Sequence, residues 1–263
     1  MRWAEPPERP MSPSFGPGLP LYFRPPQALR QQTDSVVPET IECPENIVHV
    51  WGFHLDAQPE MLSYWRSLLS AEERQRAERF VQPQQVARWV AAHGLKREVL
   101  SLYLQKAAHE LRFVALPDGK PVLHQPGHEK WHFNLSHSHQ RLLIAVSCSG
   151  PVGVDIEYHD PSRPFLALAQ RFFHPDEAAA MTTMNETLAR TQFYRAWVAK
   201  EAYGKYRGTG LGGHLLDYRI EARVDDYFCI GGIWVITHRL PQHVLGWTLP
   251  KGISPLNINA SSK

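Results

Sequence analysis

Two carboxylates separated by one residue are the first candidates for chemistry in this sequence. Asp155 and Glu157 lie in Gly-Val-Asp-Ile-Glu, a run that predicts a β-strand, so their side chains share one face. Two carboxylates this close repel each other unless a cation or a proton compensates. Oxygen ligands suit Mg²⁺ or Mn²⁺, which commonly also binds a substrate phosphate. Taken alone, the pair is more typical of an exposed acidic strand face than of a metal site.

An acid and a lysine on a predicted helix are the second candidates. Glu201 and Lys205 are four residues apart and therefore share a face, whereas Lys200 lies about 100° around the helix from Glu201. Phe193 and Trp197 have the same spacing and are expected on the buried side. By itself, this pattern predicts only an exposed ion pair worth about 0.3–0.5 kcal/mol.

The elements that must position these residues form two rounds of strand, helices and further strands. This order indicates an α+β fold with two similar halves, a pseudo-dimer. The first round has strands at 47–51, 131–135 and 141–147 and helices at 71–80 and 84–108. The second has strands at 152–157, 218–224, 227–236 and 245–249 and helices at 165–173, 176–184 and 187–206.

Proline content separates the ends of the chain from these halves. Ten of the 22 prolines fall in the first 44 residues, and proline disfavours both helices and strand ladders. We therefore divide the chain into a mostly unstructured leader (1–45), an N-terminal half (46–150), a C-terminal half (151–250) and a loose tail (251–263).

Composition restricts the partners and the compartment. The net charge of +2 over 263 residues demands neither nucleic acid nor anionic lipid. The sequence has no run of about 20 apolar residues that would span a membrane, and its start has no apolar signal segment. Three scattered cysteines, with no CxxC pair, favour a reducing compartment. We expect a cytoplasmic protein.

Together, the two candidate segments resemble the signature pair of the 4′-phosphopantetheinyl transferases of the Sfp-like type. Those enzymes move the phosphopantetheine arm of coenzyme A onto a serine of an acyl or peptidyl carrier protein. Further segments resemble motifs of this family in the same order: residues 70–80 with Arg88, Asp-Gly-Lys-Pro at 118–121, Phe-Asn-Leu-Ser-His-Ser at 133–138, and Gly-Leu at 210–211. The resemblance covers about residues 70–211.

The resemblance implies a role for each candidate residue. Asp155, Glu157 and Glu201 would hold magnesium against the pyrophosphate of coenzyme A. Glu201 would also accept the proton of the carrier serine, and Lys205 would stabilise the leaving 3′,5′-ADP. We also place Lys200 in the catalytic group, where its charge would support the helix face electrostatically.

The phosphates of coenzyme A also need polar and basic contacts. The resemblance assigns these contacts to Ser136 and His137, together with Lys120, Arg88, Asp155 and Lys205. Arg74, Arg76 and Arg79 are weaker candidates. The resemblance also implies a monomer whose active site lies in the cleft between the halves, with an apo carrier protein and coenzyme A as partners.

Two other enzyme or binding classes remain open at this stage. A metal-dependent nuclease or phosphohydrolase would also combine Asp, Glu and Lys, but its usual Glu-x-Lys spacing is missing because His159 stands two residues after Glu157. A coenzyme A or carrier-binding module without activity is the non-catalytic alternative. Five histidines lie close together in the sequence, at positions 124, 128, 132, 137 and 139. A zinc site there is disfavoured because neither an acid nor a cysteine lies at ligand spacing from them.

Overall fold

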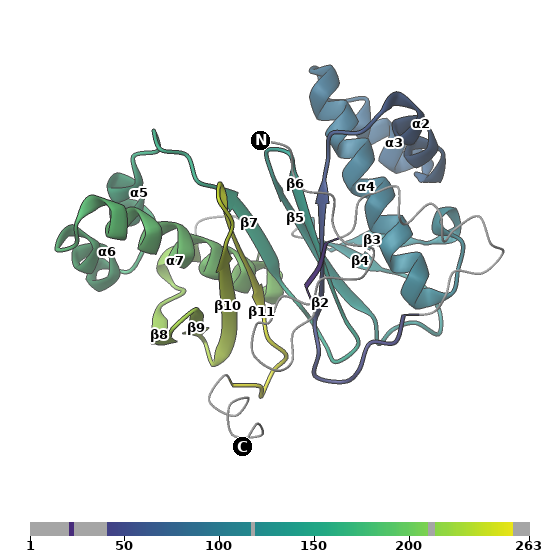
Figure 1. The fold of residues 1–263 in the computed structure, drawn as a ribbon. Helices are drawn as coiled ribbons and strands as arrows, with labels where there is room; N and C mark the ends of the chain where they lie inside the picture. The colour runs from purple at the N-terminus through teal and green to yellow at the C-terminus, as the bar shows by residue number, and fades with distance from the viewer. Residues whose placement is uncertain (1–20, 24–40, 117–118, 210–213, 255–263) are drawn as a thin grey trace.

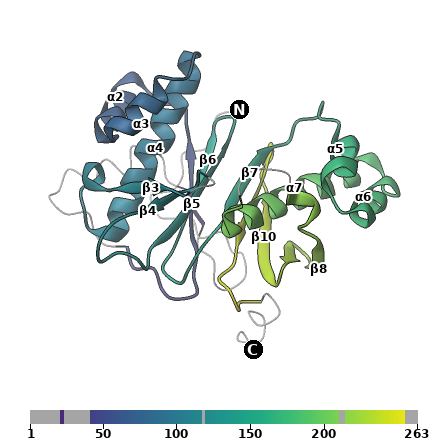
Figure 2. The ribbon, with the colours of Figure 1, turned by 180° about the vertical axis from the view of Figure 1, so that it is seen from behind.

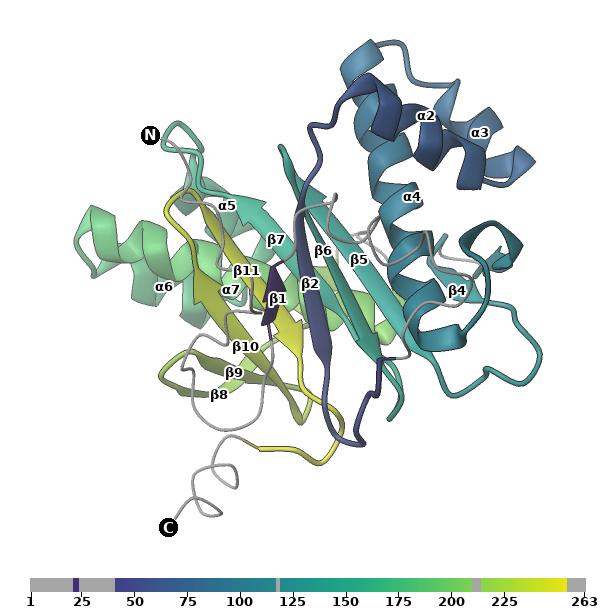
Figure 3. The same ribbon diagram turned by 45° about the vertical axis from the view of Figure 1, so that its right-hand side comes forward.

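Two β-sheets face each other in the structure, and each carries its helices on the outer side (Figure 1). The computed structural model describes residues 21–23, 41–116, 119–209 and 214–254. The chain order of the two sheets confirms the expected α+β architecture with two halves. In the N-terminal half, three antiparallel strands form the order β2-β6-β5, and β1 adds parallel to β2 (Figure 3).

The N-terminal half contains the elements up to β6. Its strands are β1 (Leu21–Phe23), β2 (His49–His54), β3 (Phe113–Ala115), β4 (Pro121–Leu123), β5 (His132–Ser138) and β6 (Arg141–Ser147). Its helices are α2 (Pro59–Leu68), α3 (Ala71–Ala77), α4 (Pro83–Leu104) and the 3₁₀ turn η1 (Ala108–Glu110).

The C-terminal half has an antiparallel five-stranded sheet in the order β7-β11-β10-β9-β8. Its strands are β7 (Val154–Tyr158), β8 (Ile220–Val224), β9 (Tyr227–Ile230), β10 (Ile233–Arg239) and β11 (His243–Thr248). Its helices are α5 (Phe165–Phe172), α6 (Pro175–Thr182), α7 (Glu186–Arg207) and the 3₁₀ turn η2 (His214–Leu216).

Strand alternation explains how the two halves join. Along β6, Leu142, Ile144 and Val146 pack against the helices of the N-terminal half. Leu143 and Ala145 point to the other face and pack in a core that also contains side chains of β7 and β11. This shared core consists of Val48, Val50, Leu143, Ala145, Val152, Val154, Ile156, Leu245 and Trp247. The two halves are therefore joined by buried apolar side chains as well as by the chain itself.

A glycine allows β7 to approach the long helix α7. A Cβ at Gly153 would lie 1.9 Å from the carbonyl oxygen of Ala202 and 2.5 Å from the backbone nitrogen of Tyr206. Both neighbouring atoms belong to the backbone, so neither can turn aside. Any side chain at this position would push apart the two elements that carry the candidate site.

The expectation of one strand over residues 227–236 is wrong. The structure shows two antiparallel strands, β9 and β10, joined at Gly231 and Gly232. Both glycines have positive φ values, 55° and 73°, which a two-residue hairpin turn needs. The helix α2 and the short strand β4 were not expected from the sequence.

Several sequence expectations fall on residues outside the described ranges. They are most of the proposed leader, Asp118, the Gly-Leu pair at 210–211, and residues 255–263 of the tail. Within the leader, residues 21–23 form β1, and the amide of Ile41 donates to the carbonyl of Leu102 at 3.2 Å. Across the described residues, every helix is too short or too polar to cross a bilayer.

Two buried histidines of the N-terminal half should make stability depend on pH. Burial lowers the pKa of His49 to about 4, and burial together with the charge of Lys96 lowers that of His93 to about 4 against the opposing Glu73. The unfolded chain therefore binds more protons between about pH 6.5 and 4, and stability falls as pH decreases through that window.

The test is urea denaturation at pH 7 and pH 5. We expect His49→Gln to reduce the loss of unfolding free energy between these pH values by about 1–2 kcal/mol. His109→Gln, at an exposed position, is the matched control and should leave the loss unchanged. An identical loss in the wild type and His49→Gln would contradict the prediction.

Candidate active site

Three elements from both halves bring the predicted residues together. β5 of the N-terminal half lies beside β7 of the C-terminal half, and α7 packs on β7 (Figures 1 and 2). Backbone amides of β7 donate to side chains of β5: Val154 to Asn134 Oδ1 and Tyr158 to Ser138 Oγ, each at 3.0 Å. These bonds fix the distance between the two halves at the site.

Asp155, Ser136 and Lys205 form a closed set of contacts. Ser136 Oγ donates to Asp155 Oδ1 at 2.8 Å. Lys205 Nζ donates to the same carboxylate oxygen at 2.6 Å and to Ser136 Oγ at 2.7 Å. Asp155 and Ser136 are buried, 5% and 6% exposed, so this ion pair is shielded from solvent. The contact joins β5, β7 and α7 in one point.

Glu201 lies one helical turn before Lys205 and is 9% exposed. Burial, followed by the negative charge of Asp155, raises the pKa of Glu201 to about 7, although Lys205 opposes the shift. The pKa of Glu157 is also raised by burial and by Asp155, against the charge of Arg163. Arg163 donates to Glu157 Oε1 at 2.7 Å. Glu201 and Glu157 therefore lie in an environment that disfavours their ionised forms unless positive charge is added.

The donor atoms of these residues are of the kind that binds a hard divalent cation. Asp155 Oδ2 is buried and has no hydrogen-bond partner among the described residues, so one carboxylate oxygen is left for a ligand. The donor set consists of carboxylate oxygens, which magnesium and manganese prefer. As they stand, no three His, Cys, Asp or Glu side chains of the described part of the chain lie close enough together to hold an ion. Lys205 supplies the positive charge beside Asp155.

Basic side chains from both halves lie at the same end of α7. Lys120 Nζ donates to the backbone carbonyl of Lys205, and Lys120 also acts on His132, whose pKa is lowered by burial and by this charge. The pKa of His137 is lowered by burial and by the charges of Lys205 and Arg88. Lys120, Lys205 and Arg88 thus place three positive charges near His132 and His137, as the binding of several phosphates requires.

Arg88 holds its place on α4 by an ion pair. Its guanidinium lies 3.5 Å from Asp56 Oδ1, and its side chain is 24% exposed. The weaker candidates Arg74 and Arg76 are engaged elsewhere. Arg74 donates to the carbonyl of Leu69 at 2.5 Å, and Arg76 lies over the ring of Trp89, 5.2 Å from its centroid. These two contacts stabilise the N-terminal half.

Lys200 is the predicted residue that the structure separates from the others. Its side chain is fully buried, its ammonium lies 2.7 Å from Glu177 Oε2, and it donates to the carbonyls of Leu215 and Tyr218. The position about 100° around α7 from Glu201 directs it under α6 and η2, away from Asp155. Lys200 therefore stabilises the packing of α6 and η2 against α7.

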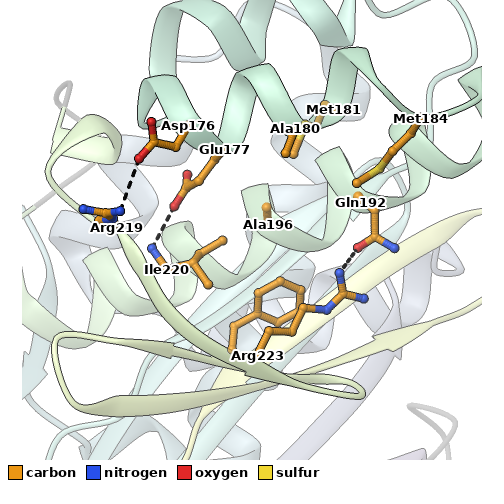
Figure 4. Close-up of a pocket in the computed structure, with 11 residues that line it drawn as sticks. Asp176, Glu177, Ala180, Met181, Met184, Gln192, Ala196, Arg219, Ile220 and Arg223 are labelled. Carbon is orange, nitrogen blue, oxygen red and sulfur yellow. Dashed lines mark hydrogen bonds and ion pairs between the residues drawn. The ribbon is translucent and has the colours of Figure 1, made fainter.

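A pocket of about 300 Å³ lies on this far side of α7, between α6 and β8 (Figure 4). Glu177 accepts from the amide of Ile220 at 2.7 Å, and Asp176 pairs with Arg219 at 3.2 Å. Arg223 donates to Gln192 on the opposite rim. The charged groups around the pocket thus bridge α6 and α7 to β8, and they lie apart from Asp155 and Ser136.

Replacing Lys200 by methionine should lower stability and spare the chemistry. Methionine keeps the length of the side chain but leaves Glu177, itself only 13% exposed, without its ion pair. We expect a loss of about 2 kcal/mol in unfolding free energy by urea denaturation, with turnover per folded molecule within about threefold of the wild type. A much larger loss of turnover in a stably folded protein would show that Lys200 acts at the reacting atoms.

Sequence reasoning missed two residues of the site region. Arg163, six positions after Glu157, neutralises that carboxylate and lies over the ring of Tyr194 at 5.6 Å. Asn134 bonds the backbone of β7, although the motif at 133–138 contains it. Only the motif offered a signal for Asn134. Arg163 follows a turn after the strand, so its spacing from Glu157 gave no signal in the sequence.

Both halves of the chain match known protein families. Residues 56–149 match the family model described as 4′-phosphopantetheinyl transferase, N-terminal, and residues 151–231 match the 4′-phosphopantetheinyl transferase superfamily. The chain is 31% identical to the 4′-phosphopantetheinyl transferase ffp of Bacillus subtilis, over 74% of this chain and 82% of that protein. It is 30% identical to Sfp of Bacillus subtilis strain 168 (67% and 77%). It is 35% identical to HetI of Nostoc sp. (62% and 70%).

Proposed function

Because this chain belongs to the 4′-phosphopantetheinyl transferase superfamily and is an enzyme of that class, we propose that it modifies a carrier protein with coenzyme A as donor. The arm of coenzyme A moves to a serine of an apo acyl or peptidyl carrier protein, and 3′,5′-ADP leaves. The bond from the serine oxygen to phosphorus forms, and the bond from that phosphorus to the bridging oxygen of the pyrophosphate breaks.

The observation that carries this proposal is the contact among Ser136, Asp155 and Lys205 beside buried Glu201. A serine hydroxyl is a weak nucleophile until a base accepts its proton. Glu201, with a pKa of about 7, takes up a proton readily near neutral pH, so we assign it as that base. Lys205 places a positive charge where the 5′-phosphate of the leaving 3′,5′-ADP gains negative charge.

We assign the metal and phosphate contacts to the residues that surround this contact. Asp155, Glu157 and Glu201 would hold magnesium, with manganese as the alternative ion, and the bound ion withdraws charge from the pyrophosphate. Arg88, Lys120, Ser136, His137 and Lys205 bind and orient the phosphates of coenzyme A. Lys200 is a positioning residue, because its ammonium is enclosed by α6 and η2.

We further propose that one chain is the active unit. Ser136 comes from the N-terminal half and Asp155 from the C-terminal half of the same molecule, and the two halves share a buried core. A second copy of the chain is not needed to complete this set of contacts. Sedimentation of the purified protein at increasing concentration tests this, with a concentration-independent monomer as the expected result.

The decisive experiment incubates the protein with coenzyme A, magnesium and apo carrier proteins from fatty acid, polyketide and peptide synthesis. We expect at least one carrier to gain the mass of one phosphopantetheine arm and to lose this gain when its acceptor serine is replaced by alanine. Chelation of divalent ions should stop the reaction. Binding of coenzyme A without transfer to any carrier would contradict the proposal, as would release of inorganic phosphate in place of 3′,5′-ADP.

A further inference from the structure

Two of the three cysteines lie side by side, and Cys43 packs against the core of the N-terminal half. Cys43 precedes β2 and Cys148 follows β6, and the two are 105 positions apart in the chain. The thiol of Cys148 donates to the carbonyl oxygen of Cys43 at 2.9 Å and lies 3.7 Å from that of Pro44. One sulfur is therefore in contact with the backbone of the residue that carries the other.

The two cysteine side chains also influence each other electrostatically. Burial, followed by the neighbouring Cys148 side chain, raises the pKa of Cys43 to about 12. The thiol of Cys43 lies 3.9 Å from the carbonyl of Ile47, on the same turn of chain. Both cysteines are partly exposed, so a small oxidant can reach them, whereas Cys229 is buried in β9.

The backbone on each side of this pair is held by contacts other than the thiols. The amide of Asn46 donates to Ser149 Oγ at 2.8 Å, which joins the two segments directly. The amide of Ile41 donates to the carbonyl of Leu102 at 3.2 Å, which anchors the Cys43 segment on α4. A bond between the sulfurs would therefore link segments that are already in place, and such prior order favours its formation.

We propose that Cys43 and Cys148 are a site of reversible disulfide formation with a small-molecule disulfide such as oxidised glutathione. The thiolate of Cys148 attacks one sulfur of the oxidant, breaks its S–S bond and releases one reduced glutathione. Cys43 then gives up its proton to solvent, a step that its raised pKa makes slow, and its thiolate attacks the Cys148 sulfur of the mixed disulfide and releases the second glutathione. The protein loses two electrons and two protons, and the oxidant gains them.

The bond closes a covalent loop around the N-terminal half. Cys43 lies just before the first antiparallel strand of that half and Cys148 just after the last, so the loop contains β2, β5 and β6 with all the helices between them. A cross-link over about 100 residues strongly restricts the unfolded chain. We expect the oxidised protein to melt about 5 °C above the reduced protein.

The experiment treats the native protein with oxidised glutathione, blocks remaining thiols by alkylation and determines the mass and the linked peptides. The expected product is a single chain lighter by two hydrogens, with Cys43 joined to Cys148 and Cys229 alkylated. Cys229→Ser, the matched control, should give the same linkage, and Cys43→Ser and Cys148→Ser should not. Dithiothreitol should restore the starting mass and Tm.

Other products would overturn the proposal. They are a glutathione adduct that persists on either cysteine in the wild type, a linkage to Cys229, and a linkage between two chains. A linked wild-type protein whose Tm equals that of the reduced form would overturn the stabilising role of the bond. The reaction is followed on the intact chain by mass, so failure of carrier modification would leave it standing.

Discussion

Glu201→Gln lowers the rate of phosphopantetheine transfer at least 10³-fold, with the fold intact. The substitution keeps the size of the side chain but removes both the proton acceptor and one oxygen charge from the proposed metal set. Loss of general base catalysis alone costs about 10²–10⁴ in rate. Because burial and Asp155 already raise the pKa of this carboxyl to about 7, a neutral amide should fit its position without loss of stability.

The measurement is the initial rate of carrier modification by mass spectrometry, together with the melting temperature. Glu186→Gln is a matched control on the same helix, since its side chain is 75% exposed and pairs with Arg190 at the surface. That variant should keep the wild-type rate. Near-normal transfer by Glu201→Gln, at saturating magnesium and coenzyme A, would refute the assignment of the base.

The second large effect concerns stability: Glu73→Gln should lower the free energy of unfolding by about 4 kcal/mol. Glu73 lies 2.6 Å from the ammonium of Lys96 and 2.7 Å from the guanidinium of Arg97, and both cations are 1% exposed. Although burial alone would raise it, a hydrogen bond from His93 and these two charges hold the pKa of Glu73 far below its usual range. Glutamine would leave two buried cations uncompensated.

Urea denaturation at pH 7 measures this loss, and Glu72→Gln is the neighbouring control. Glu72 is exposed on the same first turn of α3, so its neutralisation should leave stability close to that of the wild type. Glu73 also accepts a hydrogen bond from the amide of Ser70 at 3.0 Å, and glutamine can keep this bond. The substitution therefore tests the loss of the charge. A loss under 1 kcal/mol in Glu73→Gln would show that the buried cations find other compensation.

The elements predicted best are those whose side-chain period is clear. The apolar run of residues 141–147 predicted β6 with its bounds, and the helical spacing after Pro83 predicted α4, which ends at Leu104 rather than 108. The hairpin of β9 and β10 was missed because Tyr227 to Ile236 reads as one apolar run across two glycines. α2 was missed because its burial depends on close packing against α4. A Cβ at Gly94 of α4 would lie 2.3 Å from the Cβ of Trp65 on α2.

The same difference applies to the site: some relations between its residues follow from local spacing, and others depend on the tertiary structure. Spacing alone indicated that Asp155 and Glu157 share a strand face and that Glu201 and Lys205 share a helix face. That Ser136 bonds Asp155 depends on β5 lying beside β7, which the residue pattern does not encode. The direction of Lys200 was equally beyond the pattern, because it depends on what packs against each side of α7.

The core common to both halves has a consequence for binding kinetics. Val50, Leu143, Val154 and Leu245 exclude water from the junction, so sliding or opening one half against the other would expose apolar surface. The groups that hold Ser136 against Asp155 therefore keep one spacing before a ligand arrives. Association of coenzyme A should then follow a single exponential whose rate constant rises linearly with ligand concentration, because no slow closure of the halves precedes or follows the encounter.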